Sequence, residues 1–206
     1  MFDEWASESL LSGKSINETR NVLSQIFKRA FYDGVIESNP EERIERYKQN
    51  STELRPFSET EINRILDALP HPFKEFFQFA FYTGLRTGEL LGLRWEDIDI
   101  DNYVAHIRVN ITSGKEKAPK AAGSIRTVEL HDLAVQALVS IKSSKFFDSK
   151  RVFIDPKTRK EYKYADGLRK YTWKPTLEKL KIPYRYPYQC RHTYASMMLS
   201  SGKNPM

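Results

Sequence analysis

Apolar positions in the first part of the chain recur every three to four residues, which is the spacing of an amphipathic helix. The positions with this spacing in residues 16–36 are Leu23, Ile26, Phe27, Ala30 and Phe31. The pattern stops before Pro40, because proline cannot continue a helix. Residues 41–55 are charged and have almost no apolar spacing, so they predict a linker. The chain therefore divides into a small helical piece with its linker, residues 1–50, and a larger domain, residues 51–206.

A second helix begins with a clear local signal at Ser58. The run Ser58-Glu59-Thr60-Glu61 has the form of a capping box, and Phe57 and Ile62 are spaced as its hydrophobic staple. Helical spacing of apolar residues then continues to Pro70 and recurs over residues 73–83, where Gly84 is placed to end the helix. A short helix is expected over residues 87–93.

The apolar period changes to two at residue 103, where it predicts a strand. The apolar residues that alternate in this strand are Tyr103, Ala105, Ile107 and Val109. Residues 125–130 predict a second strand, and a basic connection over residues 112–123 joins the two. Helical spacing resumes over residues 132–142, 166–181 and 188–200, with Pro175 at a start or kink inside the second of these. The predicted fold class is mainly α with a small antiparallel β-sheet, an α+β architecture.

The composition is typical of a soluble globular protein. Of the 206 residues, 40% are hydrophobic and 29% are charged, and no apolar run approaches the roughly 20 residues of a membrane span. The first residues lack the basic and apolar regions of a secretion signal. A single cysteine, Cys190, excludes a disulfide within the chain and suits a reducing compartment. These features predict a cytoplasmic protein without membrane contact.

The net charge of +6 is unevenly distributed along the chain. Residues 1–111 hold 13 Lys and Arg against 19 Asp and Glu, whereas residues 112–206 hold 20 against 8. A cationic second half favours a polyanionic partner such as nucleic acid, because clustered cations gain free energy by displacing its counterions. A solvated basic surface gives the same count, so charge alone leaves both interpretations open.

Spacing excludes several common sites. Asp97, Asp99 and Asp101 imitate the start of a calcium loop, but Asn102 and Arg108 stand where that loop requires glycine and glutamate. Neither the phosphate-binding GxxxxGK[ST] run nor the dinucleotide-binding GxGxxG run is present, and the four histidines and one cysteine lack zinc spacing. No serine lies in a GxSxG run. Any chemistry in this chain is therefore predicted to proceed without a metal.

Two basic clusters about a hundred residues apart favour a phosphate site. Arg86 follows a helix-ending glycine between apolar residues, where it is poorly placed as a solvent-exposed charge, and its guanidinium fork fits phosphate oxygens. Arg191 lies in the second cluster, and Tyr188 shares a face of the predicted helix with it. Lys120 is predicted at the tip of a glycine-containing hairpin, where its flexible ammonium can reach a leaving oxygen. Structural roles remain open for each residue: an ion pair between Arg86 and Glu89, a solvated lysine and a half-buried tyrosine.

These residues lie in three runs that together resemble the tyrosine recombinases of the phage integrase type. The runs are Tyr82-Thr83-Gly84-Leu85-Arg86-Thr87-Gly88-Glu89-Leu90, Pro119-Lys120 followed by Ser124-Ile125-Arg126-Thr127-Val128, and Arg191-His192-Thr193-Tyr194-Ala195-Ser196. The helix before Pro40 also resembles the end of that family's core-DNA-binding domain. The resemblance implies the C-terminal part of a core-binding domain with its linker over residues 1–50. It implies an integrase catalytic domain, truncated before the nucleophile, over residues 51–206.

The resemblance also implies a role for each candidate residue. Arg86 and Arg191 would grip the scissile phosphate, and Lys120 would protonate the 5′-oxygen leaving group. Glu89 would brace the first arginine. The remaining candidates are Tyr188 at the phosphate, His192 in support, and Lys115, Lys117 and Arg126 as DNA-binding residues.

The activity that the resemblance implies is site-specific DNA recombination, such as the integration or excision of a phage or prophage. In this family a tyrosine attacks double-stranded DNA at att-type sites and forms a 3′-phosphotyrosine link, without a metal or cofactor. The implied partners are this DNA, three further copies of the chain in a tetrameric synapse, and a DNA-bending accessory protein. The implied location is the nucleoid region of a bacterial cytoplasm.

Two departures from the family pattern change the expected activity. Tyr188 stands where the family usually has histidine, and a phenol with a pKa of about 10 is a poorer base at neutral pH than imidazole. Only 15 residues follow Arg191, so we expect the nucleophilic tyrosine to be missing and the chain to bind DNA without covalent cleavage. Two other classes stay open. One is a DNA-binding regulator that uses the scaffold without chemistry, and the other is a relative of type IB topoisomerases that relaxes DNA.

Overall fold

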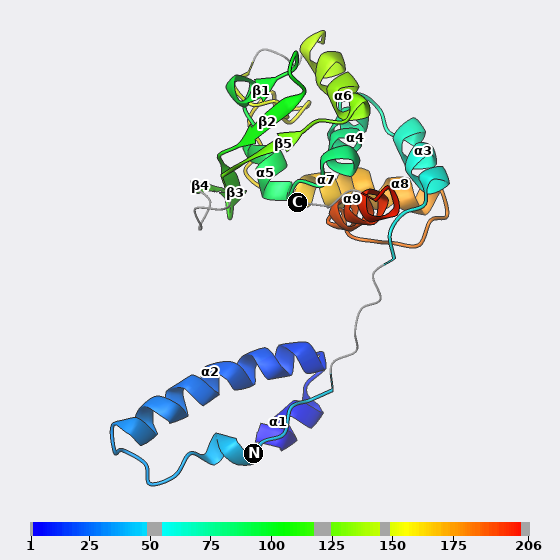
Figure 1. Ribbon diagram of the computed structural model, residues 1–206. Helices are drawn as coiled ribbons and strands as arrows, with labels where there is room; N and C mark the ends of the chain where they lie inside the picture. The colour runs from blue at the N-terminus through cyan, green and yellow to red at the C-terminus, as the bar shows by residue number, and fades with distance from the viewer. Residues whose placement is uncertain (1, 49–54, 118–124, 145–148, 203–206) are drawn as a thin grey trace. The chain divides into compact units, whose positions relative to one another are not determined.

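The computed structural model describes residues 2–48, 55–117, 125–144 and 149–202. The chain forms two compact units, Met1–Glu53 and Leu54–Met206. Figure 1 shows the helices of the first unit in blue and the mixed helical and strand architecture of the second in cyan to red.

The first unit consists of α1 (Phe2–Glu8), α2 (Gly13–Tyr32) and the 3₁₀ turn η1 (Pro40–Arg43). The helix predicted over residues 16–36 is α2, which begins after the N-cap Ser12. It ends at Tyr32, because Asp33 closes its last turn and Gly34 follows with a φ of 70°. The apolar stripe predicted for this helix is largely uncovered, and Ile26 is 58% exposed.

Residues 41–48 differ from a free linker, because polar side chains attach them to α2. Glu41 forms an ion pair with Arg20, and its carboxylate also accepts a hydrogen bond of 2.9 Å from the Ser24 hydroxyl. The side chain of Asn17 donates to the carbonyl of Tyr47 and accepts from its N–H, at 2.8 and 3.0 Å. The linker predicted over residues 41–55 therefore does not begin at residue 41. Polar contacts of Glu41 and Tyr47 attach this part of the chain to α2, although it lacks regularly spaced apolar residues.

The second unit is mainly helical, and its elements follow the predicted order. Its helices are α3 (Glu59–Ala68), α4 (Phe73–Thr83), α5 (Thr87–Gly92), η2 (Trp95–Asp97), α6 (Asp132–Lys142), α7 (Asp166–Leu168), the π-helical turn η4 (Arg169–Trp173), α8 (Lys174–Lys179) and α9 (Gln189–Ser200). Its strands are β1 (Ile98–Asp99), β2 (Val104–Ile107), β3 (Asn110–Thr112), β4 (Lys115–Lys117) and β5 (Arg126–Glu129). The predicted capping box at Ser58 is present in full.

The strands form two small antiparallel sheets. One has the order β1-β2-β5, with Ala105 opposite Val128, and the other is the hairpin β3-β4, with Asn110 opposite Lys117. The strand predicted over residues 103–109 is β2, which ends at Ile107, and the separate hairpin begins after it at Asn110. The connection predicted over residues 112–123 is wrong in its first half, because residues 112–117 belong to this hairpin, which turns at Gly114 with a φ of 73°. Residues 118–124 lie outside the described residues.

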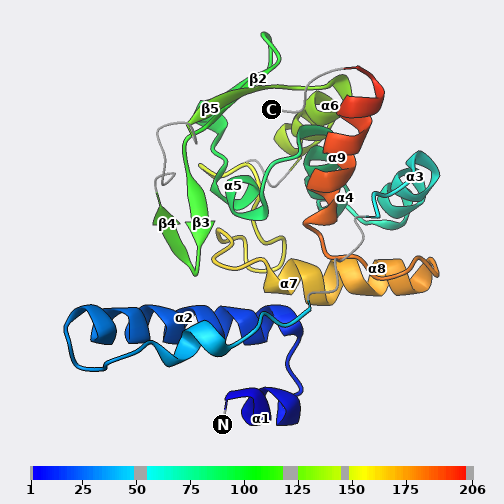
Figure 2. The same cartoon turned by 60° about the horizontal axis from the view of Figure 1, so that its bottom comes forward.

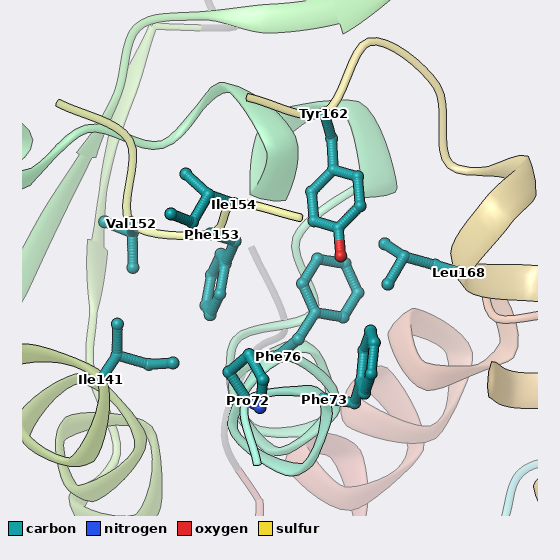
Figure 3. A pocket seen from close by; sticks show the side chains of 9 residues that line it. All are labelled: Pro72, Phe73, Phe76, Ile141, Val152, Phe153, Ile154, Tyr162 and Leu168. Atoms are coloured by element: carbon teal, nitrogen blue, oxygen red, sulfur yellow. The ribbon is translucent and has the colours of Figure 1, made fainter. Parts of the chain in front are cut away.

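Helix α4 is the centre of the core. The indole of Trp173, at the end of η4, stacks on Phe77 of α4 with ring centroids 4.5 Å apart, and Phe57 meets the same indole edge-on at 5.6 Å. Phe73 and Phe76 of α4 also line a cavity of about 10 Å³. In Figure 3 the Tyr162 hydroxyl points toward the ring of Phe76. A void of this size leaves the packing close to that of other protein interiors.

Candidate active site

Arg86 is the N-cap residue of α5 and lies three residues after Thr83, the last residue of α4. Gly84 ends α4 with a left-handed φ of 62°, and a Cβ at this position would lie 2.4 Å from the ring of Tyr194. The extended backbone that follows turns Leu85 into the core and Arg86 outward. The expectation that Arg86 is poorly placed as an exposed charge is therefore wrong, since its side chain is 52% exposed.

Glu89 fixes the position of Arg86 from inside the same helix turn. Its carboxylate accepts hydrogen bonds from the backbone N–H of Arg86 at 2.8 Å and from the Arg86 guanidinium at 3.1 Å. Burial raises the pKa of Glu89, but hydrogen bonds from Arg126 and Arg86 outweigh it and hold the pKa below its ordinary value. The ion pair considered as an alternative for Arg86 is thus present, and it leaves about half of the arginine side chain open to solvent.

Arg126 of β5 forms the second half of this cluster. Its guanidinium donates to both oxygens of Glu89, at 3.0 Å each. Such bidentate pairs fix the geometry of both partners as well as contributing energy. Sequence reasoning assigned Arg126 to DNA contact and missed this pairing, because Arg126 and Glu89 lie 37 residues apart. A direct contact of Arg126 with DNA stays a prediction.

Arg191 reaches the same turn from the last helix of the unit. Its guanidinium donates a hydrogen bond of 2.6 Å to the carbonyl oxygen of Gly84, two residues before Arg86. Figure 2 shows α9, in red, crossing close to α4. Cys190 points into the core, and burial raises the pKa of its thiol. The structure therefore brings the two predicted arginines to one turn of the chain.

Tyr188 and His192 lie beside Arg191. Tyr188 is the residue immediately before α9 and is exposed, and His192 is half-buried one turn into the helix. The two rings meet edge to face with centroids 5.1 Å apart. The imidazole therefore limits the orientation of the Tyr188 phenol at the start of the helix.

Thr193 was not given a role from the sequence, and the structure shows one. Its fully buried hydroxyl accepts a hydrogen bond of 3.0 Å from the backbone N–H of Phe57 and donates to the carbonyl of Gln189 at 2.8 Å. The helix that carries Arg191 is thereby attached to the first residues of the second unit. A threonine within a helix gave no signal of a partner so distant in the chain.

Two glycines bring the β3-β4 hairpin against the helix that begins at Arg86. A Cβ on Gly88 would lie 2.5 Å from the carbonyl oxygen of Ile111, and a Cβ on Gly92 would lie 2.8 Å from that of Val109. Figure 2 shows α5 between this hairpin and α9. Gly88 was part of the recognised motif, but this close approach of a strand is visible only in the structure.

The side chains of β4 alternate between ion pairs and solvent. Glu116 bridges two arginines, Arg94 and the buried Arg151, and these contacts hold the hairpin in place. Lys115 and Lys117 flank Glu116 and are exposed. Their side chains point to the opposite face from Glu116, because successive side chains in a strand alternate between its two faces. Lys120 follows this strand and lies outside the described residues.

The site has the charges for binding a phosphate group. Arg86 and Arg191 converge on one turn, and Glu89 compensates for Arg86 and Arg126 from the buried side.

Within the described residues no group of three or more His, Cys, Asp or Glu side chains could hold a metal ion. Asp97, the first aspartate of the run that imitates a calcium loop, forms an ion pair of 2.9 Å with Arg108. No helix in the described part of the chain is long and apolar enough to cross a membrane.

Known sequences similar to this chain are integrases and recombinases. The sequence model of the phage integrase family matches residues 55–206. The chain is 28% identical over 218 residues to the prophage integrase IntR of Escherichia coli K12, covering 94% of this chain and 53% of that protein. It is 32% identical over 229 residues to a XerC-like tyrosine recombinase of Caldanaerobacter subterraneus subsp. tengcongensis, covering 93% of this chain and 56% of the relative. The chain therefore spans about half the length of the curated relatives it matches.

Solved structures share the architecture. The integrase of the Tn1549 transposon in complex with a circular intermediate DNA matches with a TM-score of 0.84 and 20% identity, over 99% of this chain and 73% of that one. A lambda integrase tetramer bound to a Holliday junction matches with a TM-score of 0.72 and 18% identity, over 98% of this chain and 58% of that one. At these identities the likeness establishes the fold, and it confirms the predicted α+β class.

Proposed function

Because the chain belongs to the phage integrase family, we propose that it is the DNA-binding and phosphate-activating part of a tyrosine recombinase. The proposed activity is the breakage and rejoining of double-stranded DNA at specific sites, as in the integration or excision of a prophage. The observation that carries this proposal is the convergence of Arg86 and Arg191 on the turn that follows α4. Both arginines are held there by contacts that leave charge available to an anion.

In the proposed mechanism the arginines stabilise the negative charge that develops on the phosphate. When a tyrosine oxygen attacks the phosphorus, the bond to the 5′-oxygen breaks and negative charge grows on the non-bridging oxygens. Arg86 and Arg191 stabilise that charge, and Lys120 gives its proton to the departing 5′-oxygen. The phosphodiester energy is retained in the 3′-phosphotyrosine, so that the reverse attack by a 5′-hydroxyl rejoins a strand.

Supporting roles follow from the contacts around this phosphate. Glu89 keeps Arg86 and Arg126 in position, and Tyr188 offers its phenol as a hydrogen-bond donor with His192 behind it. Lys115 and Lys117 on the free face of β4 suit contacts with the DNA backbone. We assign residues 1–50 to DNA binding as part of a core-binding domain and residues 51–206 to the catalytic domain.

The larger assembly is part of the same proposal. The relatives suggest a synapse of four protomers on DNA, and a DNA-bending accessory protein is compatible with it. A bacterial cytoplasm, where such DNA is found, is the proposed location. Binding of DNA by residues 1–206 without a covalent link stays a prediction, and a protein–DNA adduct on a denaturing gel after incubation with nicked DNA would contradict it.

The test of the phosphate site is the affinity of residues 1–206 for a short duplex, measured by fluorescence anisotropy at several salt concentrations. Arg86→Ala and Arg191→Ala are each expected to lower the affinity about tenfold, since hydrogen bonds to charged groups contribute about 1.5–3 kcal/mol. Each loss should also reduce the slope of log affinity against log salt by about 0.9. Arg64→Ala is the control, because Arg64 donates to the carbonyl of Leu180 at 2.8 Å and is not among the proposed phosphate or DNA contacts. Unchanged affinity and slope in both site variants would refute the phosphate clamp.

Two further outcomes separate the recombinase from the other classes. In a protein that also carries the family's nucleophile, Arg86→Ala should abolish strand exchange, whereas a regulator without chemistry would keep its function. Relaxation of supercoiled plasmids regardless of sequence would indicate a topoisomerase instead of a site-specific recombinase.

A further inference from the structure

The extended segment that leads into α9 is held rigidly by one inward arginine. Arg185 places its guanidinium over the ring of Phe57 at 3.8 Å, donates to the carbonyl of Pro56 at 3.0 Å and pairs with Glu61. The carbonyl oxygen of Arg185 in turn accepts a hydrogen bond of 2.7 Å from the indole of Trp173. Because side chains alternate along an extended backbone, the residues on either side of Arg185 face outward.

Those outward residues are tyrosines, and they form a row. Tyr184 and Tyr186 flank Arg185, their rings meet edge-on at 5.2 Å, and Tyr188 follows two residues later. All three rings are exposed, with Tyr186 at 62%. Three aromatic rings on a backbone that cannot move freely form a surface suited to stacking, since little conformational entropy is lost when they bind a flat partner.

A groove opens beside this row, and its lining includes Thr87, the neighbour of Arg86. It has a volume of about 310 Å³, at the lower end of the roughly 300–1,000 Å³ of small-molecule sites. The buried rings of Phe76 and Phe77 line it, together with Leu168, Tyr186, Tyr188 and Thr87, the residue that follows Arg86. Phe76 and Leu168 also line the small cavity of Figure 3.

An ion pair between Arg169 and Asp166, 3.5 Å apart, lies at the edge of the groove. Arg169, which also lines the groove, is within hydrogen-bonding range of the Tyr184 hydroxyl, and this contact together with Asp166 raises the pKa of its guanidinium. The groove thus places apolar ring faces next to the proposed phosphate site, because Thr87 in its lining follows Arg86 directly. Nucleotides have the complementary arrangement, a flat base joined through its sugar to an anion.

We propose that the groove and the tyrosine row bind an unstacked DNA base whose neighbouring phosphate lies between Arg86 and Arg191. This inference rests on the proposed function, because it places the base one nucleotide unit from the phosphate of that reaction. Any base can be accepted, since stacking uses the ring face that all bases share. The site would stabilise DNA in which a base has left the helix near the position of strand breakage.

The test compares three DNAs that differ at one position. Residues 1–206 are titrated with a fully paired duplex, the same duplex with one unpaired base, and that bulged duplex with an abasic residue in place of the base. The wild type is expected to bind the unpaired base about tenfold more tightly than the abasic DNA, the range for one stacked base. A 2-aminopurine as the unpaired base should lose fluorescence on binding, because stacking quenches it.

Two substitutions at Tyr186, which lies outside the proposed catalytic residues, separate stacking from other contacts. Tyr186→Leu should remove the preference for the unpaired base and the quenching, while Tyr186→Phe should keep both, because a phenyl ring stacks without the hydroxyl. Tyr171→Leu is the matched control, since Tyr171 is 70% exposed and does not line the groove. All variants should bind the fully paired duplex like the wild type.

Several results would overturn the inference without touching the proposed function. The first is equal affinity of the wild type for the DNA with the unpaired base and for the abasic DNA. The second is loss of the preference for the unpaired base in Tyr186→Phe. The third is an equal fall in the affinity of Tyr186→Leu for all three DNAs. Self-association on sedimentation that Tyr186→Leu abolishes would assign the groove to a second copy of the chain. Failure of the proposed function gives a different result, namely no salt-dependent binding to any of the DNAs.

Discussion

Glu89 is the buried carboxylate that Arg86 and Arg126 share, and its replacement by glutamine tests how much the site depends on this charge. Glutamine has nearly the same shape, so no cavity is created. It places an amide NH₂ group against a guanidinium where the native residue accepts hydrogen bonds, and it leaves two cations without a counterion. The expected result is a loss of stability of the second unit.

The magnitude follows from the burial of the three side chains. Removing one partner of a buried ion pair costs about 3–5 kcal/mol, and Glu89 is 6% exposed. Arg86 is half exposed and can turn toward water, so we expect about 3 kcal/mol, at the lower end of that range. At about 2–4 °C per kcal/mol for a domain of this size, Tm should fall by roughly 6–12 °C.

Urea unfolding at pH 7, followed through the fluorescence of Trp173 and Trp95, measures this loss. Glu96→Gln is the control, because Glu96 forms an exposed pair with Arg94 and such pairs contribute about 1 kcal/mol or less. The pKa of Glu89 is lowered in the folded state, so its contribution is present above the ordinary value of 4.5 and is lost as the pH falls through the folded pKa. The difference between wild type and Glu89→Gln should therefore shrink in acid. A loss below about 1 kcal/mol at pH 7, the range of exposed pairs, would refute this reasoning.

Three further substitutions or modifications test the packing around the site. Gly88→Ala should cost about 1–3 kcal/mol and increase amide exchange in the β3-β4 hairpin, because its Cβ would lie 2.5 Å from the carbonyl of Ile111. Gly167→Ala, next to open space, should leave both unchanged. Thr193→Val should cost about 1–3 kcal/mol in urea unfolding by leaving a buried N–H without its acceptor, whereas Thr193→Ser should restore most of it. Cys190 should react with a thiol reagent only after unfolding, since burial raises its pKa, and rapid labelling of the native protein would contradict the buried position.

Local chemistry made the helices of the second unit predictable from sequence. The capping box at Ser58 and the left-handed glycine at position 84 each depend on residues within one turn, so the start of α3 and the end of α4 could be located without tertiary information. Arg86, Glu89 and Arg191 could also be identified from sequence, because each lies in a contiguous run that resembles the family's motifs. Their family resemblance is confirmed by the match over residues 55–206.

Contacts between distant segments were not predictable in this way. Arg191 and Gly84 are separated by 107 residues, and nothing near either one indicates the other. The β3-β4 hairpin carries Lys-Glu-Lys in its second strand, which has no apolar alternation, so the period that identifies strands is missing there. Glycines in α5 and the ion pairs of Glu116 stabilise it instead, and these appear only when the helix and hairpin are together.

The hydrogen bond between Phe57 and Thr193 also has a consequence for the order of events during synthesis. It joins residues 136 apart, so this hydrogen bond cannot form until Thr193 has been synthesised, 136 residues after Phe57. At about 5–20 residues per second, that interval is roughly 7–27 s. During it the apolar face of α3 and the ring of Phe57 lack their final partners, and contacts of such long range slow folding in general. The phosphate site, which needs Arg191 of α9 against Gly84, therefore cannot assemble before α9 has been synthesised.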